Sequence, residues 1–434
     1  MELTPMQHLS RLIAPLFLVL SFNAFAVDSD GDGLDDSVET NTGTFVSASD
    51  TGTDPNVFDS DNDGFSDGAE VSFGTDPNAI TQSPFEKKLT ASDGAANNKF
   101  GNSVSISGNT AVIGASGDSY NPSVLGSAYV YVRSNGVWSE QAKLTASDGS
   151  SGDSFGVSVS IDGDTAVIGA YRDEVYSGSA YVYVRNNGVW SEQQKLTASD
   201  GTERDYFGYS VSISGDTAVI GASRDDDNGS NSGSAYVYVR SNGVWTEQQK
   251  ITASDGAPDD YFGRSVSISG DTAVMGANGD DNYSGSAYVY VRSNGVWTQQ
   301  QKLTASDGAQ NTSFGYSVSI SGDTAVVGAY RDYDNGLNSG SAYVYVRNNG
   351  VWSEQQKLTA SDGTERDYFG YSVSIDGDTA VIGALMAIEA LNQARPMCMC
   401  AVMACGLSSK KSPPVMVRSM ITLAFASRSR ATRR

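Results

Sequence analysis

Residues 207–256 read FGYSVSISGDTAVIGASRDDDNGSNSGSAYVYVRSNGVWTEQQKITASDG, and closely similar text recurs along most of the 434-residue chain. The Phe-Gly opening occurs six times, at steps of 55, 52, 55, 52 and 55 residues: Phe100, Phe155, Phe207, Phe262, Phe314 and Phe369. A fixed period of this size indicates one supersecondary unit that is repeated along the chain. The fold of the protein therefore follows from the fold of one unit.

Each unit contains four predicted β-strands. In the copy quoted above, Ser210–Ile213 alternates polar with apolar residues, which indicates a half-buried strand. Ala218–Ile220 is a short apolar run, and Ala235–Val239 alternates small aliphatic residues with tyrosines, so both strands can pack on two faces. A fourth, more polar strand begins at Val244 and runs through the lysine of the EQQK phrase.

Turn signals set how these strands pair. Gly215-Asp216 and Asn242-Gly243 are two-residue signals for tight hairpins, between strands one and two and between strands three and four. The other two connections are long, so in an antiparallel sheet they share the opposite edge. A four-stranded antiparallel unit repeated five or more times is typical of an all-β fold, the β-propeller, in which each sheet is one blade. Stacked blades then bury one another's faces.

The long connections form one variable, acidic face of the predicted propeller. We favour the interpretation that its acids form a solvated surface. The alternative is a patch that binds a cation weakly or faces a ligand. These acids are Asp173, Glu174, Asp225, Asp226, Asp227, Asp280, Asp281, Asp332 and Asp334. The tyrosines near this face form either a rim that binds sugar or protein, or part of the packing. They are Tyr171, Tyr206, Tyr261, Tyr330 and Tyr368.

Two phrases of the unit carry a resemblance to a known family. Phe207-Gly208 and Val219–Ala222 resemble the two halves of the FG-GAP repeat of integrin α-subunit propellers, with Ser223 where proline is usual. The resemblance covers about residues 85–384 and implies a seven-bladed propeller that acts in adhesion or extracellular recognition. Integrin-type blades often carry a calcium loop in the first hairpin, but here that hairpin is only a short Ser-Gly-Asp type of turn. We therefore expect no calcium at that position.

Two acidic loops precede the repeats and have the spacing of calcium loops. Each places oxygen-bearing side chains at loop positions 1, 3, 5, 9 and 12, with glycine at position 6 and a backbone carbonyl at position 7. The predicted calcium ligands are Asp28, Asp30, Asp32, Leu34, Asp36 and Glu39 in the first loop, and Asp59, Asp61, Asp63, Phe65, Asp67 and Glu70 in the second. The alternative is a solvated acidic linker. With Thr-Asp-Pro-Asn at 53–56 and 75–78, the region resembles thrombospondin type-3 repeats, which are calcium-stiffened spacers.

The chain is expected to begin with an export signal. Residues 1–26 are typical of a cleaved secretory signal peptide, because an apolar stretch precedes Ala24-Phe25-Ala26. The calcium-loop module is predicted at 27–78, a linker at 79–86 and the propeller at 87–384. Residues 87–94 repeat the end of the fourth-strand phrase, and an N-terminal fourth strand could complete the last blade and close the ring. The protein is thus expected to be secreted or held at the cell surface.

Residues 385–434 break the repeat pattern. All three cysteines lie there, together with eight of the 28 lysines and arginines and a single acid, Glu389. In another reading frame, the codons of residues 394–417 can spell the repeat phrases SAYVYVRSNGVW and EQQK at their expected place. We interpret this tail as a frameshift product that is not part of the native fold. The sixth unit should then end on an unpaired strand, Ala380–Ile382, which favours aggregation, whereas the restored frame should give a seven-bladed monomer.

Composition narrows the function. Residues 1–384 hold 20 basic and 50 acidic residues, a charge that repels nucleic acid and anionic membranes. The only histidine, His8, lies in the signal peptide, and the repeats before residue 385 contain no cysteine, which excludes His/Cys zinc sites and thiol or histidine catalysis there. We expect a calcium-binding protein that recognises an extracellular protein or glycan without catalysis. The alternatives are a polysaccharide-active enzyme that uses two loop carboxylates, and a structural matrix or spacer component.

Overall fold

The structure is a computed structural model that describes residues 27–31, 34–57, 59–60, 67–73, 76–78, 88–95, 97–117, 126–134, 136–385, 400–406 and 417–421. These residues belong to two compact units that divide between Lys87 and Lys88. The predicted signal peptide, residues 1–26, and the predicted linker, residues 79–86, lie outside the described residues. In the described part of the chain, no helix has both the length and the apolar character needed to cross a membrane.

The first unit consists mainly of loops. The helix described there is α1 (Asp67–Phe73), which begins inside the second acidic loop. Backbone hydrogen bonds join distant parts of the first loop and its following segment: Asn41 donates to the carbonyl of Thr53, and Thr51 donates to the carbonyl of Val38. The polypeptide therefore folds back on itself between the two acidic loops.

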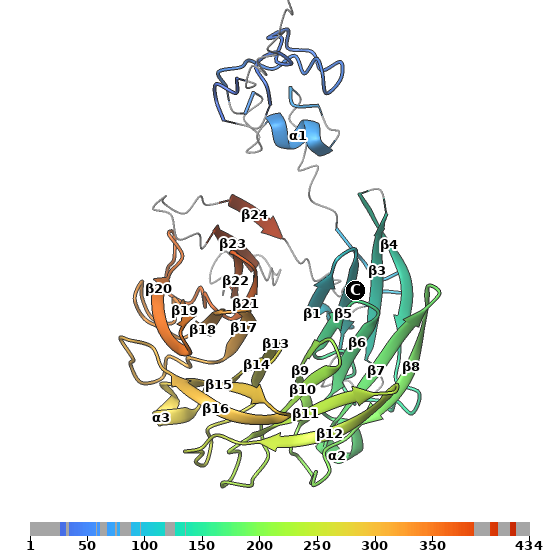
Figure 1. The fold of residues 1–434 in the computed structure, drawn as a ribbon, viewed down its shortest axis with the longest axis vertical. Coiled ribbons are helices and arrows are strands. Elements are labelled where there is room, and N and C mark those ends of the chain that lie inside the picture. Colours follow the sequence, from blue (N-terminus) through green and yellow to red (C-terminus); the bar gives the residue numbers. More distant parts are fainter. Residues whose placement is uncertain are drawn as a thin grey trace, which may run out of the picture. The chain divides into compact units, whose positions relative to one another are not determined.

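The described residues of the second unit form six antiparallel sheets of four strands, and the strands of each sheet follow chain order (Figure 1). The first three sheets are β1 (Phe100–Ser107), β2 (Thr110–Ala115), β3 (Ser127–Ser134), β4 (Val137–Leu144); β5 (Val159–Asp162), β6 (Thr165–Ala170), β7 (Ser179–Asn186), β8 (Val189–Leu196); and β9 (Phe207–Ser214), β10 (Thr217–Ala222), β11 (Ser234–Ser241), β12 (Val244–Ile251). The last three are β13 (Ser265–Ser269), β14 (Thr272–Ala277), β15 (Ser286–Ser293), β16 (Val296–Leu303); β17 (Ser317–Ser321), β18 (Thr324–Ala329), β19 (Ser341–Asn348), β20 (Val351–Leu358); and β21 (Ser372–Asp376), β22 (Thr379–Leu385), β23 (Cys400–Gly406), β24 (Val417–Ile421).

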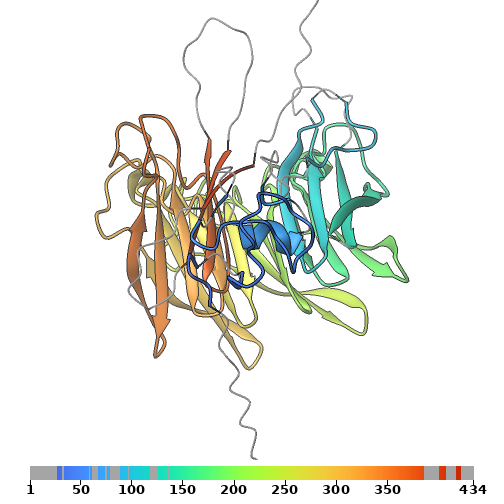
Figure 2. The same ribbon diagram turned by 90° about the horizontal axis from the view of Figure 1, so that it is seen from above.

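Short helical turns interrupt two of the loops between second and third strands. They are α2 (Asp173–Tyr176) and α3 (Asp280–Tyr283). Figure 2 shows that the strands of successive sheets run roughly along a common direction. The first strands of neighbouring sheets lie closer together than their fourth strands do, so the sheets converge at one edge as propeller blades do. The all-β fold class and the count of about six encoded blades are confirmed.

Both predicted hairpins are confirmed. Ser241 pairs with Val244, so the turn between β11 and β12 holds two residues. Those residues, Asn242 and Gly243, have φ of 50° and 80°, the left-handed values that a type I′ turn requires at both positions. In the turn between β9 and β10, Gly215 has a φ of 56°. The four strands therefore pair in the register that the turn signals predict.

Apolar side chains are buried between consecutive sheets. One such cluster contains Val219 and Val237 of the third sheet together with Phe262 and Met275 of the fourth. Phe262 is fully buried, and its ring meets Tyr288 edge-on at 5.5 Å between centroids. The phenylalanine of each Phe-Gly phrase thus anchors one blade on the next, which is why a single blade cannot bury both of its faces alone.

The Phe-Gly and Gly-Ala phrases of neighbouring units meet at these junctions. A Cβ atom at Gly221 of β10 would lie 2.0 Å from the carbonyl oxygen of Gly263, which follows Phe262. Gly263 has a φ of 79°, and a Cβ there would lie 2.2 Å from the carbonyl oxygen of Ser234. Only two glycines let the two backbones approach this closely, so the paired phrases are a requirement of blade packing.

We expect Gly221→Ala to lower the free energy of unfolding by about 2 kcal/mol, because the added methyl group has no room and the junction must open. Gly201→Ala is the matched control, since Gly201 lies in an exposed turn where the nearest contact of a Cβ would be the Ala198 methyl group at 3.3 Å. Its effect should stay within about 0.5 kcal/mol. Urea unfolding followed by tryptophan fluorescence measures both. Equal losses in the two variants would contradict this account of the junction.

The third and fourth strands of the sixth sheet, β23 and β24, are not predicted by the sequence. β22 pairs with β23, and β23 pairs with β24, so residues of the tail complete a four-stranded sheet. The prediction that Ala380–Ile382 presents an unpaired edge is therefore wrong for this chain. The physical reason is that the free backbone groups of an edge strand bond to any extended segment within reach. The frameshift origin of residues 385–434 and a seventh blade stay predictions.

Residues 88–94 pack on the first sheet. Most of the fourth-strand phrase that could close the last blade lies before Lys88, outside the described residues, so that closure stays a prediction. The hydroxyl of Tyr131 donates to the carbonyl of Thr90 at 2.8 Å, as Tyr183 of the second sheet donates to Thr145 at 2.6 Å. The segment therefore supplies the first blade with the same turn that every later blade receives from the preceding unit.

Candidate functional site

The two acidic loops of the first unit share one hydrogen-bond pattern. In the first loop, the backbone N–H and the hydroxyl of Ser29 donate to the two carboxylate oxygens of Asp36, at 2.8 and 2.7 Å. In the second loop, Ser60 donates in the same way to Asp67, at 2.8 and 2.6 Å. Loop positions 2 and 9 are thus joined in both loops, which draws the ends of each acidic run together.

Among the predicted calcium ligands that the structure describes, three are buried carboxylates. Glu39, Asp67 and Glu70 are only 5%, 0% and 0% exposed. The hydroxyl of Thr53 donates to Glu39 at 3.2 Å, and Asp67 and Glu70 lie in the first turn of α1. A carboxylate is costly to bury unless a cation or several donors compensate its charge. Residues 27–78 contain no lysine, arginine or histidine, so this segment supplies no cation of its own.

The structure describes two thirds of the predicted ligand set. Asp28, Asp30, Leu34, Asp36 and Glu39 of the first loop are described, as are Asp59, Asp67 and Glu70 of the second, whereas Asp32, Asp61, Asp63 and Phe65 lie outside the described residues. Near the start of the first loop, the backbone N–H of Gly31 donates to Asp28 at 2.7 Å. Oxygen donors gathered in this way, with buried carboxylates among them, fit the preference of a hard cation such as calcium.

The propeller neutralises its own loop acids with lysines. Nζ of Lys250 on β12 lies 2.7 Å from Asp200, 2.9 Å from Asp225 and 2.5 Å from Asp227. Asp200 ends the preceding unit, and Asp225 opens the loop between β10 and β11. The hydroxyl of Tyr236 bonds to Asp200 and Asp225, at 2.7 and 2.8 Å. One ammonium group and one phenol thus bind acids from two units.

This arrangement recurs in the first five sheets. The acids and their lysines are Asp93 with Lys143; Asp148, Asp173 and Glu174 with Lys195; Asp200, Asp225 and Asp227 with Lys250; Asp255 and Asp280 with Lys302; and Asp307, Asp332 and Asp334 with Lys357. Sequence reasoning missed the role of these lysines. The signal was present, because the lysine that ends the fourth-strand phrase and the aspartate of the Ser-Asp-Gly turn keep their places in each of the first five units.

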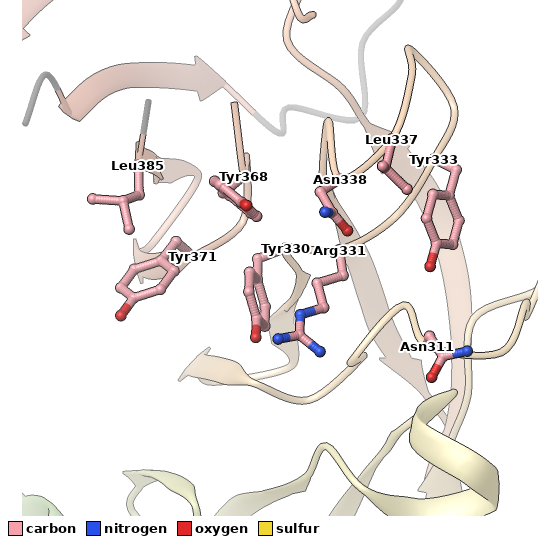
Figure 3. A pocket seen from close by; sticks show the side chains of 9 residues that line it. All are labelled: Asn311, Tyr330, Arg331, Tyr333, Leu337, Asn338, Tyr368, Tyr371 and Leu385. Carbon is pink, nitrogen blue, oxygen red and sulfur yellow. The ribbon is translucent and has the colours of Figure 1, made fainter. Parts of the chain in front are cut away.

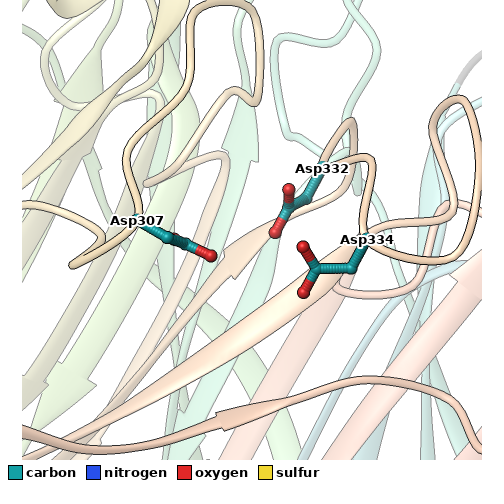
Figure 4. A group of neighbouring side chains, drawn as sticks. All are labelled: Asp307, Asp332 and Asp334. Carbon is teal, nitrogen blue, oxygen red and sulfur yellow. The ribbon is translucent and has the colours of Figure 1, made fainter.

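One acid cluster of the propeller has the geometry of a metal site, and a lysine lies within it. In Figure 4 the carboxylates of Asp307, Asp332 and Asp334 point toward one another, with ligand oxygens within 4.8 Å. Nζ of Lys357 contacts all three carboxylates, at 2.5, 2.7 and 2.5 Å. Burial opposes the ionisation of Asp307, but the hydrogen bond from Lys357 holds the pKa of this carboxyl below its ordinary value. The ammonium group therefore does here what a metal ion would do.

These contacts correct the view of the loop acids as a solvated surface. The first acid of each loop, in the second to fifth sheets, is buried and ion-paired: Asp173, Asp225, Asp280 and Asp332. The acids that follow remain exposed: Glu174, Asp226, Asp227, Asp281 and Asp334. The charge of the loop residues could not distinguish the buried acids from the exposed ones, because the lysine that pairs with the first acid comes from the far end of the same unit.

An acidic pocket of about 520 Å³ lies among the loops of the fourth sheet. Its lining includes Asp259, Asp260, Asp280 and Asp281. Burial raises the pKa of Asp260 to about 6, although the backbone N–H of Ala257 donates to it at 2.7 Å. Because this folded-state pKa is raised, the stabilisation from Asp260 is complete below its ordinary pKa of 3.8 and is lost as the pH rises through about 6.

The tyrosines noted in the sequence gather in two pairs. Tyr171 meets Tyr206 at 5.0 Å and Tyr330 meets Tyr368 at 5.9 Å between ring centroids, whereas Tyr261 bonds instead to Asp259 at 3.3 Å. A second pocket, of about 530 Å³, opens beside the Tyr330 pair (Figure 3). Its lining residues are Asn311, Tyr330, Arg331, Tyr333, Leu337, Asn338, Tyr368, Tyr371 and Leu385. Rings, amides and one guanidinium group dominate this lining.

Known protein families match both units. The FG-GAP repeat family matches residues 84–131, 138–183, 190–238, 245–290, 297–345 and 352–393, and the bacterial TSP3 repeat family matches residues 28–44 and 59–79. No curated protein matches the chain. Both kinds of repeat support an extracellular protein, and FG-GAP propeller families are generally non-catalytic. Because these six matches cover more than half of its length, the chain belongs to the FG-GAP repeat family, as a propeller-like protein with bacterial TSP3 repeats before its blades.

Proposed function

We propose that this protein is exported by a cleaved signal peptide, binds calcium through its two acidic loops and recognises an extracellular protein or glycan in adhesion. One observation carries the calcium part: Glu39, Asp67 and Glu70 are buried in a segment that has no basic side chain. Calcium would bring positive charge to these carboxylates, with Glu39 and Glu70 closing the two loops at position 12. The bacterial TSP3 match over both loops supports the same assignment.

The propeller supports recognition without catalysis. Its first loop acids are held by lysines, as Asp225 is by Lys250, so their charge is already compensated inside the fold. The long loops lie on one face, whereas the opposite face carries two-residue turns such as Asn242-Gly243. Loops held on a rigid scaffold are where binding residues concentrate. We therefore place partner binding on the long-loop face, and expect changes at Asn242 to alter stability only.

Calcium should order the first unit. Modules of this extracellular type bind calcium with Kd around 10⁻⁴ to 10⁻³ M, so about 5 mM calcium should fill both loops. We expect calcium to slow chymotrypsin cleavage within residues 28–70 at least tenfold relative to EDTA, because the bound ion holds carboxylates that otherwise repel one another. Chymotrypsin is a serine protease that EDTA does not inactivate, and the segment offers it Leu34, Phe45, Phe58 and Phe65. Mass spectrometry of the fragments locates the cuts. Magnesium at the same concentration is the control, and cleavage that is equally fast with calcium and EDTA would overturn the proposal.

A further inference from the structure

The residue after each Phe-Gly phrase differs from unit to unit, although the phrase itself does not. In chain order these residues are Asn102, Val157, Tyr209, Arg264, Tyr316 and Tyr371. Each lies within the first residues of the first strand of its sheet or one to two residues before it, at the edge where neighbouring sheets converge. The six units act as an internal control here: blade packing accepts asparagine and valine at this position, so the fold does not require tyrosine or arginine.

Arg264 sits between two of these tyrosines. Its guanidinium carbon lies 4.7 Å from the ring centroid of Tyr209 and 4.8 Å from that of Tyr316. Nη2 of Arg264 also donates to the hydroxyl of Tyr316 at 3.2 Å. Three successive blades therefore contribute to one stacked group, in which the rings hold the guanidinium plane in place.

Further tyrosines extend this group in both directions. Tyr171 lies 5.3 Å from Tyr209, and Tyr330 lies 4.3 Å from Tyr316 and 5.6 Å from Tyr371 between ring centroids. All of these side chains are partly or fully exposed. We call this set the tyrosine–arginine belt: Tyr171, Tyr209, Arg264, Tyr316, Tyr330 and Tyr371. The belt joins the two tyrosine pairs on the long-loop side into one continuous surface.

The belt carries positive charge that the described part of the protein does not neutralise. The third-strand arginines of the second to fifth sheets are ion-paired, as Arg240 is with Asp216 at 2.6 Å, whereas the equivalent Arg133 of the first sheet donates to the amide of Asn109. Among the described residues, no carboxylate forms an ion pair with Arg264, or with Arg331, whose guanidinium lies 5.2 Å from the Tyr330 ring centroid. These two guanidinium groups lie on one surface of a chain that holds 51 acids and 28 lysines and arginines. They are placed to take negative charge from outside the protein.

The lining of the pocket at one end of the belt indicates which further chemical groups a ligand would carry. Tyr330 and Tyr371 belong to both, and Figure 3 shows the ring of Tyr330 beside Arg331, with Tyr371 on its other side. Apart from the rings, the aliphatic lining is limited to two leucines, so the pocket does not suit a large apolar side chain. Tyrosine faces can stack on the C–H faces of sugar rings, while amides and phenols pair with sugar hydroxyls.

We propose that the tyrosine–arginine belt and its pocket bind an acidic glycan, with uronate carboxylates at Arg264 and Arg331 and sugar rings on the tyrosines. This inference rests on the proposed recognition function and names its ligand class. An acidic peptide offers the same charge, but it lacks the hydroxyl-rich rings that the phenols and amides of the pocket match. The net charge of −23 opposes a polyanion at long range, yet salt screens this repulsion beyond about 8 Å at physiological ionic strength.

Isothermal titration calorimetry of the full chain tests the proposal with three probes: an oligoglucuronate hexasaccharide, its methyl ester and a hexaglutamate peptide. We expect the hexasaccharide to bind, and methyl esterification to weaken binding at least tenfold because it removes the charge. Arg264→Gln should cause a similar loss, and Arg264→Lys should not restore affinity, since an ammonium group cannot make the bidentate contact. Arg331→Gln and Tyr371→Ala alter exposed side chains and keep the test valid if Arg264→Gln misfolds. Arg204→Gln, in an exposed loop outside the belt, is the control.

The outcomes separate this inference from the proposed function. Saccharide binding that is unaffected by Arg331→Gln and Tyr371→Ala, or equal binding of the methyl ester, would overturn the belt as an acidic-glycan site. Binding of hexaglutamate alone would overturn the glycan assignment. If none of the three probes binds to a sample whose residues 28–70 are still protected by calcium, the belt proposal is wrong. The proposal that the two acidic loops bind calcium is then unaffected.

Discussion

Replacing Lys250 by methionine should lower the free energy of unfolding by about 3 kcal/mol, because a buried carboxylate loses its cation. Lys250 binds Asp200, Asp225 and Asp227, and of these Asp225 is only 3% exposed. Methionine keeps most of the side-chain volume, so the loss reports charge rather than a cavity. Burial alone would lower the pKa of Lys250, but its hydrogen bonds to the three aspartates hold it above the ordinary value, so the side chain is charged in the fold.

Arg204→Met is the matched control for this variant. Arg204 lies 3.7 Å from Glu203, and the two side chains are 74% and 62% exposed, so the loss should stay below about 0.5 kcal/mol. Urea unfolding of both variants measures the difference. The effect should also shrink at low pH: the pKa of Asp200 is lowered in the fold, so its stabilisation is present above 3.8 and is lost as the pH falls below that value. A Lys250→Met protein as stable as the Arg204→Met protein would show that the junction lysines are dispensable.

The blade fold could be read from the sequence because its determinants are local. Two-residue turns such as Asn242-Gly243 set the strand pairing, and alternation within Ala235–Val239 marks a strand with two packed faces. The contact between Gly221 and Gly263 could not be read this way, since it joins two units across a sheet interface. Neither could the pairing of β22 with β23, which depends on a tail that carries no repeat pattern.

The site was predictable only where its ligands are close in sequence. Asp28 to Glu39 form one continuous loop, so spacing alone suggested the cation. The lysine clusters join residues from two units, as Asp200 and Lys250 do, and the belt joins residues one full repeat apart, as Tyr209, Arg264 and Tyr316 do. An alignment of the repeated units, position by position, would have identified both the lysine clusters and the belt, whereas the charge of each loop did not.

Replacing Glu39 and Glu70 together by glutamine should reduce calcium affinity at least a hundredfold. Each glutamate closes its loop at position 12, where a calcium loop uses both carboxylate oxygens, and a neutral amide offers one oxygen and no charge. The amide keeps the shape of the side chain, so the hydrogen bond from Thr53 to position 39 can persist. Glu203→Gln with Glu365→Gln is the charge-matched control, because both glutamates are exposed partners of arginines in the propeller loops.

The central claim is that calcium neutralises the acids of the first unit while lysines neutralise those of the propeller. Isothermal titration of calcium into the full chain tests it most directly, with Glu39→Gln/Glu70→Gln beside Glu203→Gln/Glu365→Gln. We predict about two ions per chain for the unchanged protein and the control, one for each loop, and none for Glu39→Gln/Glu70→Gln at calcium concentrations up to about 1 mM. If that variant still binds both ions with the affinity of the unchanged protein, Glu39 and Glu70 do not hold calcium, and the account of the first unit is contradicted.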